Sequence, residues 1–238
     1  MQAMDRYEDI TVILPTLNEG RNIAAMLRSL GMLYPGACFM VSDDGSTDDT
    51  RIQCANSAVP CHFIDRSSRP VKGLTASVLE AIGEVGTPFF IVIDADGQHP
   101  PEKIAQIVDL LRSGTELVLA NRVQVVGRWE LHRKALSRFG TFIGRLSLRL
   151  RGRNFGNADI LSGFFGVRTE KWRQAFAARG GERVFCPEGF KILFDFLKCV
   201  PKDLRIGAVG YDFHIRGAGY SKLTFRVYRQ FLRSCLLF

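Results

Sequence analysis

The sequence predicts an α/β fold, a mostly parallel sheet flanked by helices. Two observations predict it: short apolar runs alternate with segments of helical periodicity, and three of these runs end in polar clusters. The chain has 238 residues, 46% of them hydrophobic, which suits a single domain spanning 1–238. This composition excludes a disordered chain, a collagen-like chain and a small disulfide framework.

The expected strands are short apolar runs. Residues 10–14 are a β-branched run that we expect to stop at Pro15, and residues 88–93 are the most apolar run. Further strands are expected at 39–41, 62–64 and 116–120.

The expected helices alternate with these strands. Residues 23–30 carry apolar side chains at the i, i+3, i+4, i+7 spacing of an amphipathic helix. Further helices are expected at 48–57, 76–83 and 102–111. Pro101 suits the first turn of the last of these.

Polar clusters follow three of the expected strands, at 16–19, 43–47 and 94–98. Ligands of open α/β sheets bind outside the carboxyl ends of the strands, so these clusters are candidate ligand loops. Neither a Gly-x-Gly-x-x-Gly nor a Gly-x4-Gly-Lys-Ser/Thr pattern follows a strand. The negative charge of a phosphate bound at this edge would therefore have to be neutralised by groups other than a glycine-rich phosphate loop.

The sharpest cluster is Asp94-Ala-Asp96, directly after an apolar run. In an extended segment both carboxylates would face one spot, where a cation would relieve their repulsion. Hard oxygen ligands favour Mg²⁺ or Mn²⁺, and Gln98 can add a neutral oxygen. The alternative interpretation is a solvated acidic loop or a helix cap before Pro101.

Charge divides the chain in two. Residues 1–121 hold 9 Lys and Arg against 16 Asp and Glu, whereas residues 122–238 hold 23 against 8. The second part contains a basic amphipathic pattern with a possible break at Gly140 or Gly144, and residues 223–238 mix arginine with Leu and Phe. Both segments are typical of helices that lie in a membrane interface. In the basic amphipathic pattern, the apolar positions are Leu136, Phe139, Ile143, Leu146 and Leu150.

Four ordered motifs carry a resemblance that covers residues 11–223. They are Leu14-Pro-Thr-Leu-Asn-Glu19, Asp43-Asp-Gly-Ser-Thr-Asp48, Asp94-Ala-Asp-Gly-Gln98 and Asp159-x-x-Ser-Gly-Phe164. Together they resemble the family-two glycosyltransferases of the GT-A (Rossmann-like) fold, and more narrowly the dolichyl- and polyprenyl-phosphate mannose synthases. In this reading residues 1–121 bind the nucleotide sugar and residues 122–238 face the acceptor and the membrane.

The resemblance implies roles for individual residues. Base and ribose would contact Pro15, Leu17, Glu19, Ser42 and Asp44; the sugar would contact Asp94 and Ala95; and the metal would be held by Asp96 and Gln98. The lipid phosphate would be bound by Arg122, Arg133 and Ser137, and the donor diphosphate by Arg216 and Lys222, with Lys191 nearby. Asp94, Asp96, Arg122, Arg133 and Ser137 would form the catalytic set.

The sequence departs from the family at two places. Leu17 stands where the family usually has an aromatic residue, and Ala120-Asn121 stands where Gly-Ser or Gly-Thr is common. These departures bear on the base and the sugar more than on the reaction.

Several of these residues also have structural interpretations. Arg133 and Ser137 suit the polar face of an amphipathic helix, and Arg216 suits a solvated loop. Glu19 suits a helix N-terminus, where the dipole favours a negative charge. Asp159 and Ser162 suit a cap.

The resemblance implies metal-dependent, inverting transfer of mannose from GDP-mannose to a polyprenyl monophosphate. Two alternatives stay open: the same reaction with UDP-glucose or another nucleotide sugar, and a non-enzymatic binder of nucleic acid or anionic membrane. The expected partners are the donor, the lipid acceptor, a membrane surface and either an anchoring subunit or membrane helices that follow, without nucleic acid. The polar N-terminus and the scattered cysteines predict a reducing, cytosolic compartment, and no apolar run is long enough for a transmembrane helix. Together with the basic amphipathic segments, they predict a peripheral protein on the cytoplasmic side of a membrane.

Overall fold

The computed structural model describes residues 6–126, 131–178, 181–214 and 225–236. Within these ranges one sheet runs in the order β3-β2-β1-β4-β6-β5-β7. Strand β6 is antiparallel to both neighbours, and the other pairs are parallel. The strands are β1 (Ile10–Thr16), β2 (Cys38–Asp43), β3 (His62–Asp65), β4 (Phe89–Val92), β5 (Leu117–Val126), β6 (Phe165–Arg168) and β7 (Ile206–His214). The predicted α/β architecture is confirmed.

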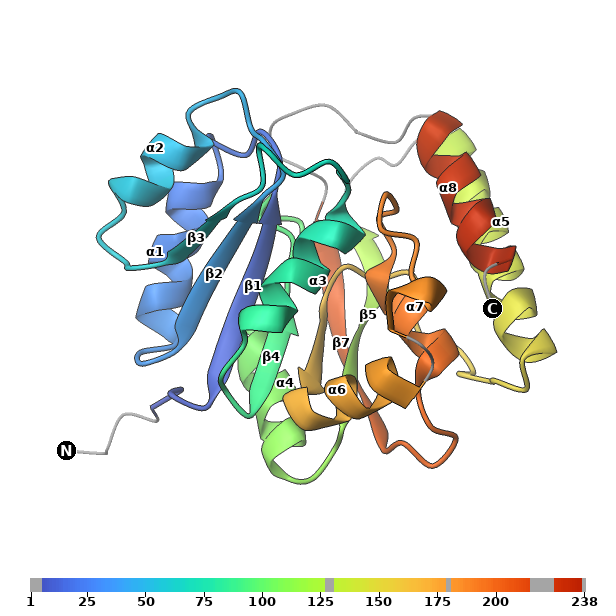
Figure 1. Cartoon of the computed structure of the whole chain (residues 1–238). Coiled ribbons are helices and arrows are strands. Elements are labelled where there is room, and N and C mark those ends of the chain that lie inside the picture. The colour runs from blue at the N-terminus through green and yellow to red at the C-terminus, as the bar shows by residue number, and fades with distance from the viewer. Residues whose placement is uncertain (1–5, 127–130, 179–180, 215–224, 237–238) are drawn as a thin grey trace.

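Helices cover both faces of this sheet, and two helices form a separate pair at one side (Figure 1). The helices are α1 (Ile23–Leu33), α2 (Thr50–Ala55), α3 (Leu74–Glu84), α4 (Lys103–Arg112), α5 (Leu131–Leu150), α6 (Thr169–Ala178), α7 (Ile192–Cys199) and α8 (Phe225–Leu236), with a 3₁₀ turn at Gly181–Val184. The separate pair consists of α5 and α8. Each predicted helix of the first half forms, with ends that differ by a few residues.

Strand β1 continues through Pro15, where the sequence predicted that it would stop. The Ile93 N–H donates to the Ile13 carbonyl, so Ile13 faces β4, and by the two-residue repeat of a strand Pro15 faces the same side. The ladder between β1 and β4 ends at Ile13 and Val92. The missing N–H of Pro15 therefore costs no ladder hydrogen bond.

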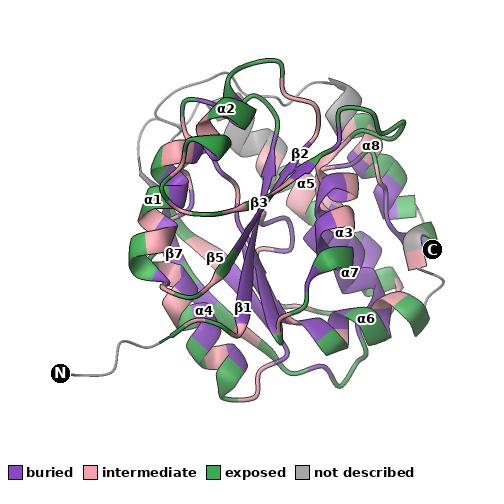
Figure 2. Ribbon diagram, turned by 60° about the vertical axis from the view of Figure 1, so that its left-hand side comes forward, coloured by how far each residue is buried: buried purple, intermediate pink, exposed green. Residues whose placement is uncertain are grey.

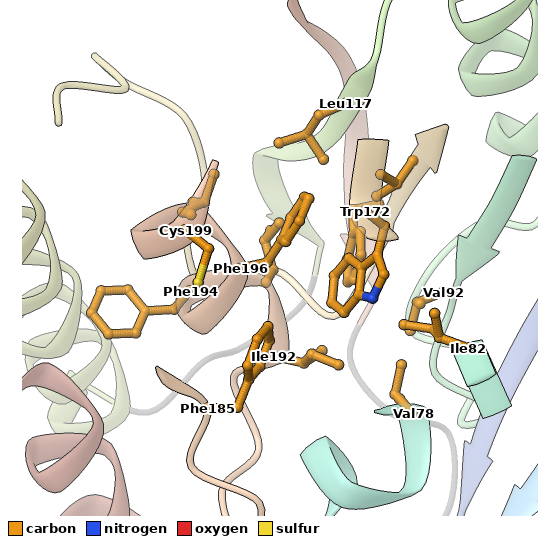
Figure 3. Close-up of a cluster of buried hydrophobic side chains, with 14 of the residues drawn as sticks. Val78, Ile82, Val92, Leu117, Trp172, Phe185, Ile192, Phe194, Phe196 and Cys199 are labelled. Atoms are coloured by element: carbon orange, nitrogen blue, oxygen red, sulfur yellow. The ribbon is translucent and has the colours of Figure 1, made fainter. Parts of the chain in front are cut away.

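The sheet separates two hydrophobic cores. Alternate residues of β4 point into each: Phe90 and Val92 face α3, α6 and α7, whereas Phe89 and Ile91 face α1 and α4. Figure 2 shows the central strand β1 buried along its whole length, and the four residues of β4 are buried too, whereas the edge strand β3 has exposed residues. In the first core Trp172 stacks on Phe196 with ring centroids 4.2 Å apart, and Figure 3 shows both rings among aliphatic side chains. Burial on both faces explains why these strands read as continuous apolar runs.

Helices α5 and α8 pack on each other beside this core. α5 is continuous through Gly140 and Gly144, so the break suggested by these glycines does not occur. A Cβ at Gly144 would lie 3.1 Å from Ile160 and 3.4 Å from Phe231 of α8. Gly144 therefore allows α5 to approach its neighbours closely.

The two last strands of the sheet were not predicted from the sequence. Strand β6 has only four residues, and β7 contains two glycines, so neither has a strong alternating pattern. Both matter to the site, because β6 brings the preceding residues 159–164 against β4, and β7 lies beside β5.

Candidate active site

Two loops at the carboxyl ends of β1 and β2 are held together by hydrogen bonds. The Asn18 side chain accepts from the Thr47 N–H at 2.8 Å, and the Asn18 N–H donates to Ser46 Oγ at 2.7 Å. Asn18 adopts φ 55°, a left-handed conformation that asparagine tolerates. These contacts set the first two predicted ligand loops side by side.

Asp43 organises the second loop, and its neighbour Asp44 is tied to a buried arginine. Asp43 Oδ1 accepts from the N–H groups of Gly45 and Ser46. Asp44 is paired with Arg66 and accepts from the Gly73 N–H at 2.7 Å. Burial raises the pKa of the Asp44 carboxyl, while Gly73 and Arg66 act in the opposite direction. The predicted nucleotide residue Asp44 therefore lies within a fixed network.

The remaining residues predicted for base and ribose differ in exposure. Leu17 is 38% exposed, whereas Pro15 and Glu19 are buried. The Ser42 side chain is fully buried and donates to the Ser77 carbonyl at 2.9 Å. Of these four residues, Leu17 offers the largest open surface at the carboxyl end of β1.

The Asp94–Asp96 segment turns directly after β4 and is not extended. The turn begins at Ala95, which is buried, and Gly97 takes φ 73°. Asp96 is 7% exposed, and its Oδ1 accepts from the Gln98 N–H at 3.0 Å. The expectation of an extended segment at Asp94–Asp96 was therefore wrong, and the two carboxylates have different surroundings.

Asp94 is packed between a glycine and a histidine. A Cβ at Gly163 would lie 2.7 Å from Asp94 Oδ2, so this close approach requires glycine. His99 Nε2 lies 3.3 Å from the same oxygen, Asp94 Oδ2. The Asp94 side chain is 30% exposed and so remains open to a ligand.

Arg122 lies within β5, which continues to Val126, and it forms a bidentate pair with Asp159. Its Nε donates to Asp159 Oδ2 at 2.5 Å and its Nη2 to Asp159 Oδ1 at 3.2 Å. The Asp159 N–H in turn donates to Asn121 Oδ1 at 2.8 Å. Burial lowers the pKa of Arg122, but the pair with Asp159 outweighs it and raises that pKa. Arg122 is thus a cation of fixed orientation.

Lys191 belongs to the same cluster. Its ammonium group donates to the Leu161 carbonyl at 2.7 Å. Burial and the nearby Arg122 charge lower the pKa of Lys191 to about 8, whereas Asp159 and Asp94 act to raise it. Tertiary packing therefore gathers Asp94, Arg122, Asp159 and Lys191, which come from four separate segments.

The carboxylate at Asp96 suits a divalent cation that is completed by a substrate. Among the described residues, no three His, Cys, Asp or Glu side chains gather as a metal site. Mg²⁺ commonly takes one or two protein carboxylates and fills its remaining positions with water and phosphate oxygens. Asp96 and Gln98, two residues apart at the β4 edge, fit that ligand set.

The described part of α5 presents arginine and apolar side chains to the surface. Phe139, Phe142 and Leu150 are 59%, 64% and 80% exposed. A depression of about 350 Å³ is lined by Ser137, Arg138, Thr141, Phe142, Arg145, Leu146 and Arg149. The Arg133 side chain, Arg216 and Lys222 lie outside what the structure describes. No described helix is both long and apolar enough to cross a bilayer.

The sequence alone did not single out four residues of the site. Arg66, His99 and Tyr211 are almost fully buried polar side chains, and Gly163 makes its contact by lacking a side chain. Two of them had a local signal, because His99 follows the Asp94–Gln98 motif directly and Gly163 lies inside the Asp159–Phe164 motif. Arg66 and Tyr211 depend on contacts between distant segments.

Comparison with known proteins extends along nearly the whole chain. The dolichol-phosphate mannosyltransferase of Pyrococcus furiosus is 32% identical over 232 residues, which cover 94% of this chain and 62% of that protein. This chain thus spans about three fifths of that relative's length. The polyprenol monophosphomannose synthase of Mycolicibacterium smegmatis is 28% identical over 223 residues, covering 90% of this chain and 80% of that protein.

The fold is shared with a solved enzyme. The glucosyl-3-phosphoglycerate synthase of Mycobacterium tuberculosis, in complex with Mn²⁺, UDP-glucose and phosphoglyceric acid, superposes with a TM-score of 0.64 at 22% identity. The match covers 96% of this chain and 80% of that one. The model of the family "Glycosyl transferase family 2" matches residues 11–176. The chain belongs to glycosyl transferase family 2.

Proposed function

We propose that this protein transfers mannose from GDP-mannose to a polyprenyl monophosphate of the dolichyl type, with inversion at the anomeric carbon. The observation that carries the proposal is the cluster of Asp94, Arg122, Asp159 and Lys191, which joins carboxylates to fixed cations at the sheet edge. Relatives named as dolichol-phosphate and polyprenol-phosphate mannosyltransferases support the acceptor and the sugar.

The donor would bind along the carboxyl ends of β1, β2 and β4. In this proposal Pro15, Leu17, Glu19, Ser42 and Asp44 form the surroundings of base and ribose, and Asp94 with Ala95 contacts the sugar. Asp96 and Gln98 would hold Mg²⁺ or Mn²⁺, which supplies charge neutralisation for the leaving diphosphate. Lys191, Arg216 and Lys222 would add positive charge to the same diphosphate.

The acceptor is already a nucleophile at neutral pH. The second pKa of a phosphate monoester is about 6, so its oxygen carries a negative charge and needs no strong general base. The acceptor needs a rigid cationic site, and the Arg122 guanidinium in its bidentate pair suits a phosphate. Arg133 and Ser137 would complete this site from α5. A single in-line displacement then inverts the sugar.

The exposed faces of α5 and α8 support a peripheral position on a membrane. Phe142 and Leu150 of α5 and Leu236 of α8 are 64%, 80% and 77% exposed, beside several arginines. Aromatic and aliphatic side chains can enter the headgroup region while arginine contacts anionic lipid. We propose that this face lies on the cytoplasmic leaflet, where the lipid acceptor is presented.

A donor screen tests the proposal. The protein is incubated with polyprenyl phosphate and radiolabelled GDP-mannose or UDP-glucose, and label in the lipid extract is counted with Mn²⁺, Mg²⁺ or EDTA. We expect label from GDP-mannose only with a metal, and loss of transfer in Asp96→Asn. Asp109→Asn, on the exposed side of α4, serves as the matched control. Preferential transfer from UDP-glucose would establish the alternative donor, and no transfer from either would overturn the reaction.

Vesicle flotation tests the membrane position separately. We expect the protein to float with vesicles that contain anionic lipid and to float less when Phe139→Ser and Phe142→Ser are combined. Met32→Ser, which removes an exposed apolar side chain of α1, is the control. Equal flotation of all three proteins would remove α5 from the proposed membrane contact.

A further inference from the structure

His99 lies buried between the candidate sugar-binding carboxylate and a tyrosine of β7. Its Nε2 is 3.3 Å from Asp94 Oδ2, and its Nδ1 is 2.7 Å from the Tyr211 hydroxyl. His99 and Tyr211 are only 4% and 2% exposed. Both ring nitrogens of His99 therefore face defined polar partners inside the protein.

The surroundings of His99 hold its ring in one plane. The ring centroids of Phe164, Tyr211 and Phe213 lie 5.6, 5.4 and 5.4 Å from that of His99. Tyr211 pairs with Arg122 in the register of β7 and β5. The position of His99 is therefore set by the same strands that carry the candidate phosphate-binding arginine.

The polar contacts define an order of donors and acceptors. An ionised carboxylate only accepts hydrogen bonds, so Nε2 carries the proton that faces Asp94. In a neutral ring Nδ1 then accepts from the Tyr211 hydroxyl, which fixes the tautomer. The same carboxylate oxygen lies against Gly163, where even a methyl group would collide with Oδ2. Asp94 is thereby confined by His99 and Gly163 together.

From this arrangement we infer that His99, itself oriented by Tyr211, is a positioning residue that holds the Asp94 carboxylate in the orientation needed to receive the donor's sugar. His99 is separated from the ligand surface by its burial and acts through Asp94. This inference rests on the proposed function for the identity of the sugar donor, but the orientation of Asp94 is a property of the protein itself.

Donor binding gives the first readout, because Asp94 would contact the sugar and not the nucleotide. Calorimetry would compare GDP-mannose with GDP for the wild type and for His99→Phe, which suits the aromatic surroundings. We expect affinity for GDP-mannose to fall roughly 10- to 100-fold, as is typical when a supporting hydrogen-bond partner is lost, while GDP affinity changes less than about twofold. Equal losses for both ligands, or none, would overturn the inference.

Two further variants separate positioning from packing. His99→Gln keeps an N–H donor near the position of Nε2 and should recover part of the GDP-mannose affinity lost in His99→Phe. Tyr211→Phe removes only the hydroxyl, so we expect a smaller loss than in His99→Phe. His62→Gln, at an exposed histidine paired with Glu84 at 2.7 Å, is the control and should bind like the wild type. No recovery in a folded His99→Gln would contradict the role of the N–H group.

Crystal structures of the wild type and His99→Phe give a readout that does not depend on the donor. We expect the Asp94 carboxylate to rotate away from its position beside Gly163 when the histidine is replaced. An unchanged Asp94 in His99→Phe would overturn the inference even if GDP-mannose were the true donor. If neither donor supports transfer, the proposed reaction fails, whereas the rotation of Asp94 still decides the role of His99.

Discussion

Arg122 and Asp159 form a two-point ion pair that joins β5 to the loop before β6. Both carboxylate oxygens accept from the guanidinium, at 2.5 and 3.2 Å, and the Arg122 side chain is only 24% exposed. The pair fixes the plane of the guanidinium before any ligand arrives. A phosphate that binds Arg122 would therefore meet a group whose orientation is already set.

Removing the charge of Asp159 should weaken binding of the lipid phosphate. In Asp159→Asn the bidentate acceptor is lost and Arg122 becomes free to rotate. We expect the KM for polyprenyl phosphate to rise about tenfold, equivalent to ~1.4 kcal/mol, with a smaller change in the KM for the donor. Initial rates at varied acceptor concentration measure this. Asp203→Asn, at an exposed position, is the control; a normal acceptor KM in Asp159→Asn would contradict the role of the pair.

Lys191 should make donor capture depend on pH. Burial and Arg122 lower its pKa to about 8, so the ammonium is charged below pH 8 and neutral above it. Attraction for the donor diphosphate is then present at pH 7 and lost as the pH rises past 8. We expect kcat/KM for the donor to fall between pH 7 and 9, where the acceptor phosphate no longer titrates.

Lys191→Arg provides the matched comparison for this pH profile. Arginine stays protonated throughout the range, so the decline above pH 8 should disappear even if the maximal rate is lower. A decline that persists unchanged in Lys191→Arg would assign the titration to another group.

Gly163 should be intolerant of even a methyl group. A Cβ there would lie 2.7 Å from Asp94 Oδ2, so Asp94 or the loop must move. We expect Gly163→Ala to lower kcat by at least about tenfold, because a displacement of about 1 Å at a reacting centre is enough for such losses. Circular dichroism would show the fold retained.

Gly83, unlike Gly163, has room for a methyl group and provides the control substitution. It lies in α3, and a Cβ there would meet nothing within 4 Å. Gly83→Ala should leave activity unchanged and raise the free energy of unfolding by about 0.5–1 kcal/mol, through helix propensity. Equal activity in Gly163→Ala and Gly83→Ala would show that the close approach to Asp94 is unimportant.

A buried ion pair within α7 also contacts α8. Lys198 Nζ lies 2.8 Å from Asp195 Oδ1, with both side chains 1% exposed, and it also donates to the Ser234 carbonyl of α8. Lys198→Met would leave Asp195 buried without this cation. We expect the free energy of unfolding, measured in urea, to fall by about 3–5 kcal/mol.

The double variant Asp195→Leu with Lys198→Met tests the cause of that loss. Removing both charges relieves the uncompensated carboxylate, so part of the stability should return. If Lys198→Met left the free energy of unfolding unchanged, or if the double variant were less stable than the single one, the loss could not be assigned to the uncompensated Asp195 carboxylate.

Features carried by neighbouring residues could be predicted from the sequence. The apolar runs, the periodicity of residues 23–30 and the polar clusters at 43–47 and 94–98 are local, and they indicated the parallel sheet and its ligand edge. Strand β6 could not be predicted, because four residues carry too little pattern and their pairing with β4 and β5 is a long-range contact.

The sequence by itself determined the fold class, the family resemblance and the chemical types of the candidate site residues, because each follows from contiguous residues and their order. Only the tertiary structure decided how these groups are arranged. Arg122 meets Asp159 across 37 positions and His99 meets Tyr211 across 112. Such contacts depend on the sheet order and on side-chain packing. Close packing also decided that Gly163 touches Asp94 and that Lys191 lies in the same cluster, since no local spacing encodes either contact.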